Sequence, residues 1–440
     1  MSVQVAEPLE GEPVVEPSLY AVVALYLAIA VLYAALQEHN RRKRDAAATS
    51  RRQSGPPWPG VDVVLPCYNE DPAVLAACCA SLEAQDYPGE LHVFLIDDGS
   101  NNRDVLAGVY QRYSDHAGWT VLLLDHNGKR KAQDAAVSAG TGELVVTVDS
   151  DTVFAPDGIR RLVGAFADPR VGAVTGDVRA VNSTQNRLTR LIDERYRLLF
   201  EHERAAQSRV GAVLCCAGPF SAYRRSALQG VWAAYLSQTF MGNRTVAGDD
   251  IHLTNLVLAN GYNSLYEPSA KAFTTVPSTL RPYLRQQLRW NRSFYRELVP
   301  TLGAMTGRDR IRYLALDVVS RLLLPLLLAI GLTLAVMQAI MALVSLAEPS
   351  TALAGFGALA LAGVVSAGLL RLKTSKPDFV LLYGLIYVGL LIPVRLWALG
   401  TIREEGWCTR RLERSARRRS EAPTVTIVET APVALVSSSG

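Results

Sequence analysis

The sequence predicts an α/β domain with a mostly parallel sheet, joined to helical segments that cross a membrane. Five short apolar runs alternate with stretches of helical pattern, at residues 61–65, 91–96, 120–124, 144–148 and 171–175. Continuous apolar strands separated by roughly 20 residues are typical of a parallel sheet with helices on both faces. The 440 residues are 49% hydrophobic, which fits a soluble domain plus membrane segments rather than either alone.

The first apolar run covers residues 18–36 and contains no charge. Its length is close to the roughly 20 residues that a helix needs to cross a bilayer. A signal peptide would also be apolar, but residues 1–17 are acidic and contain no Lys or Arg. Six Lys and Arg residues follow between Arg41 and Arg52, and basic residues beside a span stay cytoplasmic. We therefore expect an acidic tail (1–17), a transmembrane helix (18–37), a basic linker (38–60) and a cytosolic domain (61–278).

Residues 322–399 contain the other predicted spans. Two strong apolar runs, 322–346 and 351–370, are separated by Ala347-Glu348-Pro349-Ser350, which is too polar to continue a helix. A third run, 379–399, is weaker because Arg395 lies inside it. Three spans would place the tail (400–440) outside the cell, yet this tail is rich in arginine. Either the tail is an exception or one segment does not cross, and the end beyond Pro423 is predicted to be disordered.

The charge distribution indicates which partners the protein can contact, and the cysteine spacing bears on zinc sites and disulfides. The net charge of +4 lies largely in clusters beside the apolar runs, which favours contact with the lipid bilayer. No basic groove with aromatic residues typical of nucleic-acid binding is evident, so no nucleic-acid partner is expected. The sequence identifies no protein partner. The six cysteines lack C-x-x-C spacing, so neither a zinc site nor a disulfide framework is predicted.

Polar residues follow three of the predicted strands. Pro66-Cys67-Tyr68-Asn69-Glu70 follows the first, Asp97-Asp98-Gly99-Ser100 the second and Asp149-Ser150-Asp151 the fourth. Sheets of this kind bind ligands at the carboxyl ends of their strands. The three segments therefore predict a nucleotide-binding edge.

Asp149 and Asp151 form a candidate site for a divalent cation. Magnesium binds through one or two carboxylates plus substrate phosphates, so two carboxylates suffice to hold it against a diphosphate. A solvated turn or a helix cap would also explain this pair. Asp98 can accept hydrogen bonds from a uracil or a ribose, and a plain strand-to-helix turn is the alternative.

Two further segments can contact a nucleotide sugar or its acceptor. Gly128-Lys129-Arg130-Lys131 opens a helix, where cations oppose the helix dipole; phosphate binding would explain them, as would an exposed basic turn. Gly248-Asp249-Asp250 precedes a helical run and offers either a general base or a pair of N-capping acids.

Residues 279–321 are predicted to form amphipathic helices at the membrane interface. Arginines recur at positions 281, 285, 289, 292 and 296, within an arc of about 80° on a helix, opposite Tyr283, Trp290 and Phe294. Such a helix can lie on lipid headgroups, or bind phosphate through Arg and a sugar face through Trp.

The motifs Asp97-Asp98-Gly99, Asp149-x-Asp151, Gly248-Asp249-Asp250 and Gln286-x-x-Arg289-Trp290, in this order and just before apolar spans, resemble the processive β-glycosyltransferases of family 2. That group includes cellulose, chitin and hyaluronan synthases. The resemblance runs from about residue 61 to residue 297. It implies a GT-A-like nucleotide-binding domain and an enzyme of the plasma membrane with several spans and a cytoplasmic catalytic domain.

Smaller segments resemble the branch that holds hyaluronan synthases and rhizobial chitooligosaccharide synthases. They include Gly128–Gln133, Glu203–Gln207 and Cys216-Ala217-Gly218-Pro219. Asp249, where the chitooligosaccharide branch usually has Glu, favours hyaluronan. The single amino-terminal span favours the chitooligosaccharide branch, and Ala217 departs from the serine usual in hyaluronan synthases.

The resemblance implies a role for each matching residue. Asp98 would bind the uridine, Lys129 or Arg130 the phosphates, Asp149 and Asp151 the metal (Mg²⁺ or Mn²⁺) and diphosphate, and Arg289 the diphosphate. Asp250 would be the general base. Cys216, Gly218, Pro219, Gln286 and Trp290 would border the acceptor.

The sequence thus predicts an inverting polymerase of UDP-sugars that exports its growing polysaccharide. Hyaluronan made from UDP-GlcNAc and UDP-glucuronate is the leading expectation, and a chitin-type product from UDP-GlcNAc alone is the alternative. A transferase acting on a lipid carrier and a non-catalytic membrane scaffold are the remaining hypotheses.

Overall fold

The computed structural model describes residues 15–51, 58–303, 307–344, 349–404 and 426–427, which fall into two compact units. One unit comprises Met1–Glu38 and Arg312–Arg395, and contains most of the long apolar helices. The other comprises His39–Ile311 and Leu396–Gly440, and contains the β-sheet.

In the described part of the chain, the sheet has nine strands in the order β11-β3-β2-β1-β4-β7-β6-β10-β5. Strands β1 to β4 are parallel to one another, β7 lies antiparallel between β4 and β6, and β10 is parallel to β6. The strands are β1 (Val61–Cys67), β2 (Leu91–Asp98), β3 (Trp119–Leu124), β4 (Leu144–Val148), β5 (Thr152–Phe154), β6 (Val171–Ala180), β7 (Phe220–Arg224), β10 (Asn263–Thr274) and β11 (Thr426–Ile427), with a separate hairpin of β8 (Thr239–Phe240) and β9 (Asn243–Arg244).

All five predicted strands are present, and a mostly parallel sheet is confirmed. The whole of β1 and β4 is buried, which explains their continuous apolar sequence. Two strands, β10 and β7, were not predicted, because one is irregular and the other is short. Strand β10 changes register between Tyr266 and Lys271, and β7 contains only five residues.

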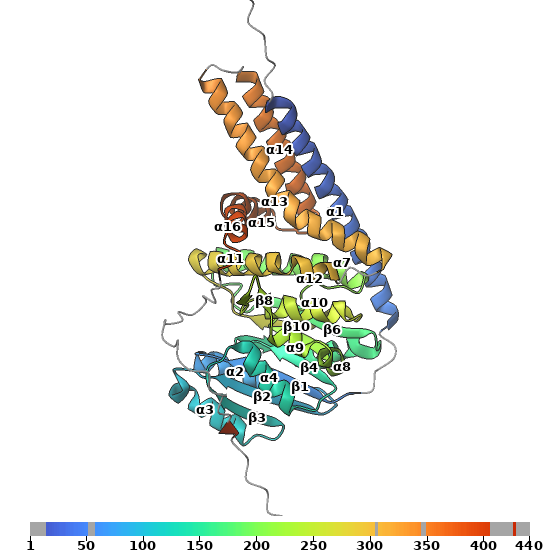
Figure 1. The fold of residues 1–440 in the computed structure, drawn as a ribbon, viewed down its shortest axis with the longest axis vertical. Helices are drawn as coiled ribbons and strands as arrows, with labels where there is room; N and C mark the ends of the chain where they lie inside the picture. The colour runs from blue at the N-terminus through green and yellow to red at the C-terminus, as the bar shows by residue number, and fades with distance from the viewer. Residues whose placement is uncertain (1–14, 52–57, 304–306, 345–348, 405–425, 428–440) are drawn as a thin grey trace, which may run out of the picture. The chain divides into compact units, whose positions relative to one another are not determined.

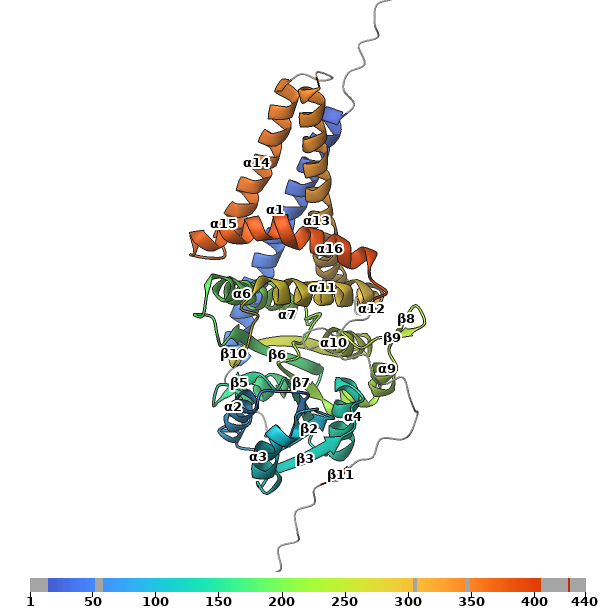
Figure 2. The same ribbon diagram turned by 90° about the vertical axis from the view of Figure 1, so that its left-hand side faces the viewer.

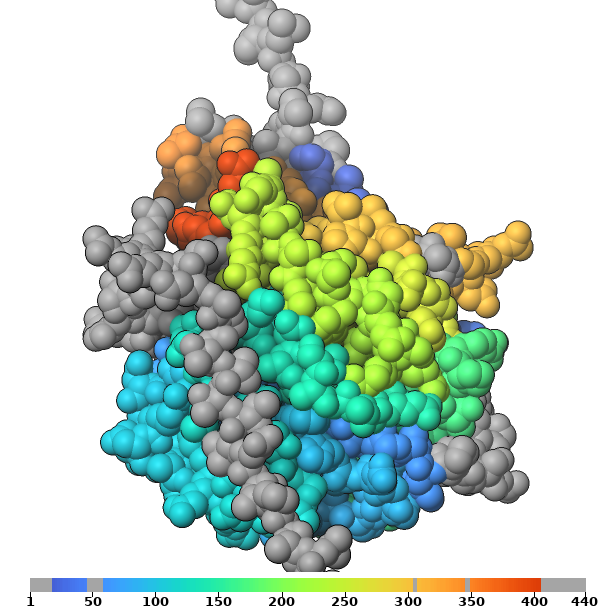
Figure 3. Space-filling model, turned by 60° about the horizontal axis from the view of Figure 1, so that its bottom comes forward, coloured from blue at the N-terminus to red at the C-terminus, as the bar shows by residue number. Residues whose placement is uncertain are grey.

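Helices pack against this sheet, with α4 on β1 and β2, α3 on β3, and α6 on β6 (Figures 1 and 2). The helical elements are α2 (Pro72–Glu83), α3 (Arg103–Ser114), α4 (Lys129–Ala139), α5 (Gly158–Gly164), η1 (Ala165–Ala167), α6 (Arg187–Leu198), the π-helix η2 (Leu199–Arg204), α7 (Ala205–Arg209), α8 (Arg225–Gln229), α9 (Trp232–Leu236), α10 (Asp249–Ala259), α11 (Leu280–Arg296) and α12 (Leu298–Gly303). Figure 3 shows one face of this unit, where the early residues in blue and teal adjoin the later ones in green.

The apolar unit is built from α1 (Val15–Arg51), α13 (Arg308–Leu343), α14 (Pro349–Arg371), α15 (Pro377–Ile386), the π-helix η3 (Tyr387–Leu391) and α16 (Ile392–Gly400). Helices α1, α13 and α14 run side by side in Figures 1 and 2, around a cluster formed by Leu19, Val23, Ala335 and Ala362. Within the described residues, four helices are long and apolar enough to cross a membrane: 18–45, 308–343, 349–371 and 377–400. The weaker run at 379–399 therefore belongs to a helix of spanning length, in which Arg395 Nη1 donates to the Tyr387 hydroxyl at 3.4 Å.

Some predictions fall on residues outside the described ranges. They concern the acidic tail as far as residue 14, residues 52–57 of the basic linker, residues 347–348 of the predicted break, Cys408 and nearly all of the basic tail. Pro349 and Ser350 begin α14. In the part of the chain that the structure describes, Cys67, Cys78, Cys79, Cys215 and Cys216 are free thiols.

Candidate active site

The carboxyl ends of β1, β2 and β4 lie at one edge of the sheet because these strands are parallel. Hydrogen bonds join the segments that follow them. The backbone N–H of Asn69 donates to Ser100 Oγ at 2.9 Å, and Ser150 Oγ donates to Glu70 Oε2 at 2.6 Å. The three polar segments singled out in the sequence therefore do meet.

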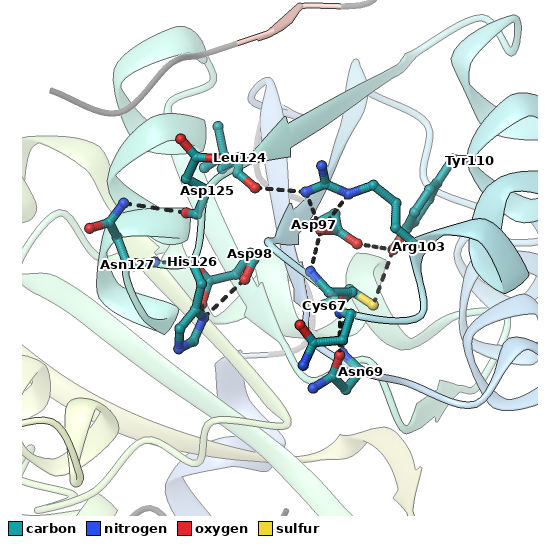
Figure 4. Close-up of polar contacts among 12 residues, drawn as sticks. Cys67, Asn69, Asp97, Asp98, Arg103, Tyr110, Leu124, Asp125, His126 and Asn127 are labelled. Carbon is teal, nitrogen blue, oxygen red and sulfur yellow. Dashed lines mark hydrogen bonds and ion pairs between the residues drawn. The ribbon is translucent and has the colours of Figure 1, made fainter. Parts of the chain in front are cut away.

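Asp97, at the end of β2, is held entirely within the protein (Figure 4). Its carboxylate is fully buried and accepts hydrogen bonds from the Tyr110 hydroxyl at 2.5 Å and from Arg103 Nη2 at 2.7 Å. Burial alone would raise the pKa of Asp97, but these hydrogen bonds lower it. Asp97 is thus a permanently charged anchor for β2.

Asp98 instead turns toward the loop that follows β3 (Figure 4). It accepts the backbone N–H groups of Asn127 at 2.9 Å and Gly128 at 3.0 Å, and burial raises its pKa. Gly99, which directly follows β2, has a φ of +70°, and a Cβ there would lie 2.4 Å from the backbone nitrogen of His126. Only glycine fits at this position, so β2 and the loop can approach closely.

His126 of this loop and Tyr68, which follows β1, form an aromatic platform that the sequence did not predict. The rings of Tyr68 and His126 stack with centroids 4.3 Å apart and planes 22° apart. His126 Nδ1 lies 3.0 Å from Asp98 Oδ2. A flat base can stack on such a pair beside Asp98. The available signal was a tyrosine directly after the first strand.

Lys129 is the centre of the site. It is the first residue of α4, whose N-cap is Gly128, and its Nζ lies 2.8 Å from Asp149 Oδ1 and 3.1 Å from Asp249 Oδ2. Burial would lower the pKa of Lys129, but the two carboxylates raise it well above its ordinary value. A Cβ on Gly218 would lie 3.4 Å from Lys129 Nζ and 3.5 Å from Asp149 Oδ2. Residues from four distant parts of the chain therefore converge here.

Arg130 points elsewhere. Its side chain is buried, Nη1 donates to the carbonyl oxygen of Tyr235 at 2.9 Å, and Nη2 bonds to Gln238. The guanidinium also lies 4.9 Å from the centroid of the Tyr235 ring. Because its donors are directed at protein groups, Lys129 is the better placed of the two to contact a phosphate.

Asp249 and Asp250 are the first residues of α10. Asp249 is buried and Asp250 is partly exposed, and the two carboxyl groups differ in proton affinity. For Asp249, burial raises the pKa, but Lys129 and Arg130 lower it below its ordinary value. For Asp250, burial and the negative charge of Asp249 together raise the pKa. Neighbouring carboxylates whose pKa values are pushed apart are suited to separate roles. Asp249 is the counter-ion of Lys129, and Asp250 is the candidate base.

The carboxylate of Asp250 is oriented by three neighbours. Oδ1 accepts the backbone N–H of Ile251 at 2.8 Å. Oδ2 accepts the thiol of Cys215 at 3.5 Å and the backbone N–H of Gly218 at 3.4 Å. Cys215 is therefore the cysteine beside the candidate base. Cys216 is fully buried, its backbone N–H donates to Thr254 Oγ1, and Pro219 is half-buried.

Asp149 and Asp151 remain partly exposed at the end of β4. Asp151 Oδ1 accepts a hydrogen bond from Thr274 Oγ1 at 3.2 Å. Carboxylate oxygens are the ligands that Mg²⁺ and Mn²⁺ prefer, so these residues fit a divalent cation. Among the described residues no group of three or more His, Cys, Asp or Glu could hold a metal ion. A cation held by this pair would complete its shell with phosphate and water oxygens.

Two of the candidate acceptor residues, Gln286 and Trp290, lie on α11. The ring of Trp290, which is 38% exposed, lies 6.3 Å from that of Tyr196 on α6. Gln286 Oε1 is buried and has no hydrogen-bond partner in the described structure. The positive charge of Arg289 reaches the site, since it lowers the pKa of both Asp249 and Asp250. Tyr196 was missed in the sequence because it lies in a helix without a motif.

The arginine stripe of α11 does not form one lipid-facing surface. Arg296 is buried, its Nε donates to the carbonyl oxygen of Ile402 at 2.9 Å, and Arg292 Nη2 donates to Thr401 Oγ1 at 2.7 Å. Backbone and hydroxyl oxygens therefore accept the hydrogen bonds of the guanidinium groups at the carboxyl end of the stripe. The interfacial location of residues 279–321 stays a prediction.

Comparisons with known proteins agree with this geometry. A mannosyltransferase from Pyrobaculum calidifontis, solved in complex with GDP-Man and Mn²⁺, has a similar fold, with a TM-score of 0.54 and 22% identity over 84% of this chain and 99% of that one. An N-acetylglucosaminyltransferase of Mesorhizobium japonicum is 42% identical over 81% of this chain and 83% of its own length. One of Sinorhizobium fredii is 42% identical over 88% of this chain and 93% of its own.

The matched region coincides with the sheet unit and α11. Residues 59–293 match the family described as "Glycosyltransferase like family 2", which covers more than half of the 440 residues. This range contains Asp98, Lys129, Asp149, Asp250 and Trp290, and it ends within the helix that carries the candidate acceptor residues. The chain therefore belongs to the family 2 glycosyltransferases and has a GT-A-like fold.

Proposed function

We propose that this protein is a membrane-embedded, inverting β-N-acetylglucosaminyltransferase that polymerises UDP-GlcNAc into chitooligosaccharide. The observation that carries the proposal is the cluster in which Lys129 joins Asp149 to Asp249, beside the base-like Asp250. The rhizobial N-acetylglucosaminyltransferases, similar over most of their length, support GlcNAc as the transferred sugar. This differs from the hyaluronan product favoured by the sequence alone.

The donor would lie along the edge of the sheet. Asp98 and the Tyr68–His126 platform would bind the uridine, and Lys129 and Arg289 would bind the diphosphate. Asp149 and Asp151 would hold Mg²⁺ or Mn²⁺, which neutralises the diphosphate as it leaves. Because Lys129 is always charged, it can offer N–H groups to the departing UDP without a change of protonation.

The acceptor would stack on Trp290 and approach Asp250. Oδ1 accepts the short hydrogen bond of Ile251 at 2.8 Å, whereas the contacts of Oδ2 with Cys215 and Gly218 are longer, at 3.5 and 3.4 Å. Oδ2 is therefore the atom that would take the proton from the acceptor hydroxyl. The oxygen would then attack the anomeric carbon from the face opposite UDP, which gives a β-linkage by inversion. We further propose that the catalytic unit lies in the cytosol, at the plasma membrane, and that the membrane helices guide the growing chain outward.

Hyaluronan remains the second candidate because of one contact. Asp249, where the chitooligosaccharide branch usually has Glu, lies 3.1 Å from Lys129, so this difference falls on the residue that positions the phosphate-binding lysine.

One assay separates the candidate products. Full-length protein with Mg²⁺ would be given UDP-GlcNAc, UDP-glucuronate and other UDP-sugars, singly and in pairs, while UDP release and product are measured. UDP-GlcNAc alone is expected to support sustained UDP release and a chitinase-sensitive product. A requirement for both sugars would establish hyaluronan instead, and label that partitions into organic solvent would indicate a lipid-carrier acceptor. If the protein releases UDP from none of the donors, an enzymatic role is contradicted.

A further inference from the structure

A second polar cavity lies in the sheet unit, away from the candidate active site. Its volume is about 430 Å³, and residues 168–171, 208–211, 263–265 and 307–310 contribute to its lining. Four arginines, Arg170, Arg209, Arg308 and Arg310, face two aspartates, Asp168 and Asp309. Four positive charges against two negative ones leave a formal charge of +2 on the lining.

Topology separates this cavity from the donor site. It is lined by Val171 and Asn263, the first residues of β6 and β10. Strand β6 is antiparallel to β7, which is antiparallel to β4, so β6 and β4 point the same way. The start of β6 is therefore at the edge of the sheet opposite to Asp149, which follows the end of β4.

The positive charge of the lining is only partly neutralised. Arg170 Nη2 pairs with Asp168 Oδ2 at 2.8 Å. Arg209 and Arg308 are exposed, and neither forms an ion pair with another residue of the described ranges. Two guanidinium groups at the mouth of the cavity are thus available to an anion.

Arg310 forms a fixed wall of the cavity. It is half-buried, its Nε donates to the carbonyl oxygen of Val210 at 3.1 Å, and its Nη2 donates to that of Gly211 at 3.1 Å and bonds to Asn263. Burial lowers its pKa. These hydrogen bonds hold the Arg310 guanidinium in place in the lining of the cavity.

We propose that this arginine cavity binds a phosphate-bearing group. The planar fork of donors on a guanidinium matches phosphate oxygens in pairs, and several arginines around one cavity are typical of phosphate recognition. The volume exceeds that of a single phosphate and suits a small organic phosphate such as a phospholipid headgroup.

The chain itself favours a lipid as the source of that phosphate. Arg308 and Arg310 begin α13, one of the four helices long and apolar enough to cross a membrane. Anionic leaflets attract basic residues that adjoin such helices. Soluble phosphate shares the same chemistry and is the other source.

The test compares two double variants of the full-length protein. Arg209→Gln with Arg308→Gln removes the free guanidinium groups of the cavity, and Arg187→Gln with Arg190→Gln removes two exposed arginines of α6 that do not line it. Each protein would be placed in phosphatidylcholine nanodiscs with and without phosphatidic acid, and lipid retention would be measured by native mass spectrometry. Inorganic phosphate and glycerol 3-phosphate would be titrated calorimetrically in detergent.

The cavity variant is expected to bind phosphatidic acid about tenfold more weakly or worse, while the control stays within about twofold of the parent. If the cavity variant loses affinity for inorganic phosphate and glycerol 3-phosphate to the same extent as for phosphatidic acid, the site is supported and its ligand is a soluble phosphate. Circular dichroism and UDP release should match the parent in both variants. Equal binding by the cavity variant and the control, or no binding by the parent, would overturn the proposal.

Discussion

Asp249 and Asp250 are adjacent in the chain and have identical side chains, yet their pKa values shift in opposite directions. Asp249 faces Lys129, and its pKa falls. Asp250 has no such lysine contact in the described structure, lies beside Asp249 and bonds to neutral donors, and its pKa rises. The lysine thus leaves the second aspartate as the stronger base.

Replacing the base tests this assignment directly. Asp250→Asn keeps the shape of the side chain but removes proton acceptance, so kcat should fall by about 10²-fold to 10⁴-fold. UDP affinity should persist, because Lys129 and Asp149 are unchanged. Turnover by UDP release and UDP binding by calorimetry would be measured, with the exposed Asp115→Asn as control. Full activity of Asp250→Asn would reassign the base.

The pH dependence follows from the same pair. Catalysis needs ionised Asp250, so kcat/KM should fall as the pH drops through its raised pKa, above the range of an ordinary carboxyl. Asp249→Asn removes the adjacent negative charge while Lys129 and Arg289 stay, so the pKa of Asp250 should fall. The acid limb of the profile should then move to lower pH, by about one unit. A limb that stays in place or moves upward would show that Asp249 does not set this pKa.

At this scale the sequence predicted which residue types meet, but not their partners. Asp149, Lys129 and Asp250 were found because motifs mark them, and the structure brings them together. Cys215, Tyr68 and Tyr196 carry no motif. Their contacts with Asp250, His126 and Trp290 arise only when distant segments pack.

At the scale of elements, the junction of α10 and α11 positions the base against the acceptor helix. Gly248 caps α10 with a φ of +83°, and a Cβ there would lie 2.7 Å from Cβ of Ser293 on α11. The absence of a side chain therefore allows the two helices to approach.

Gly248→Ala should destabilise the protein by about 1–3 kcal/mol, because it combines a strained backbone with a steric clash. Thermal unfolding and UDP release would both be measured, and both should decline. Gly108→Ala is the matched control, since it lies in α3 with no atom near the new Cβ, and it should be neutral or slightly stabilising. Equal melting temperatures for the two variants would contradict the tight junction.

Strands and helices could be predicted from the sequence where a single physical rule, such as the burial of a parallel strand, determines their pattern. Strand β4 appeared with its expected bounds because a buried parallel strand must be continuously apolar. Strand β7 was missed because an antiparallel insertion depends on its neighbours β4 and β6 rather than on its own five residues. The arginine spacing of α11 predicted that these arginines share one face of a helix. It did not predict that Arg296, in the last turn, is buried.

At the scale of the whole molecule, hydrogen bonds among polar side chains stabilise the packing of helices in the apolar unit. Asp317 is fully buried and accepts hydrogen bonds from the Tyr33 hydroxyl at 2.5 Å and from Arg321 Nε at 3.0 Å, which joins α1 to α13. The sequence analysis placed Tyr33 in an apolar run but assigned Asp317 and Arg321 to the amphipathic interface helices (279–321), whereas both belong to α13. Nothing in the sequence pattern shows which of these polar side chains pair.

Asp317→Asn removes the charge that balances Arg321 in this buried network, so it should destabilise the unit by about 3–5 kcal/mol. Unfolding of the purified protein in detergent would be followed by helical circular dichroism. Ser366→Ala, which removes only the 2.8 Å hydrogen bond to Tyr26, is the control and should cost about 1 kcal/mol. Similar losses for both would show that the Asp317 network is no stronger than one neutral hydrogen bond.

The contacts of α11 with residues 401–404 determine how far the chain can be shortened. A protein ending at Gly400 would retain the four apolar helices and every motif of the family. It would nevertheless lose Thr401, Ile402 and Glu404, which accept the hydrogen bonds of Arg292 and Arg296. Two guanidinium groups would then lack their acceptors at the base of the helix that carries Trp290. Residue 404 is therefore the earliest safe endpoint for a truncation meant to preserve acceptor binding.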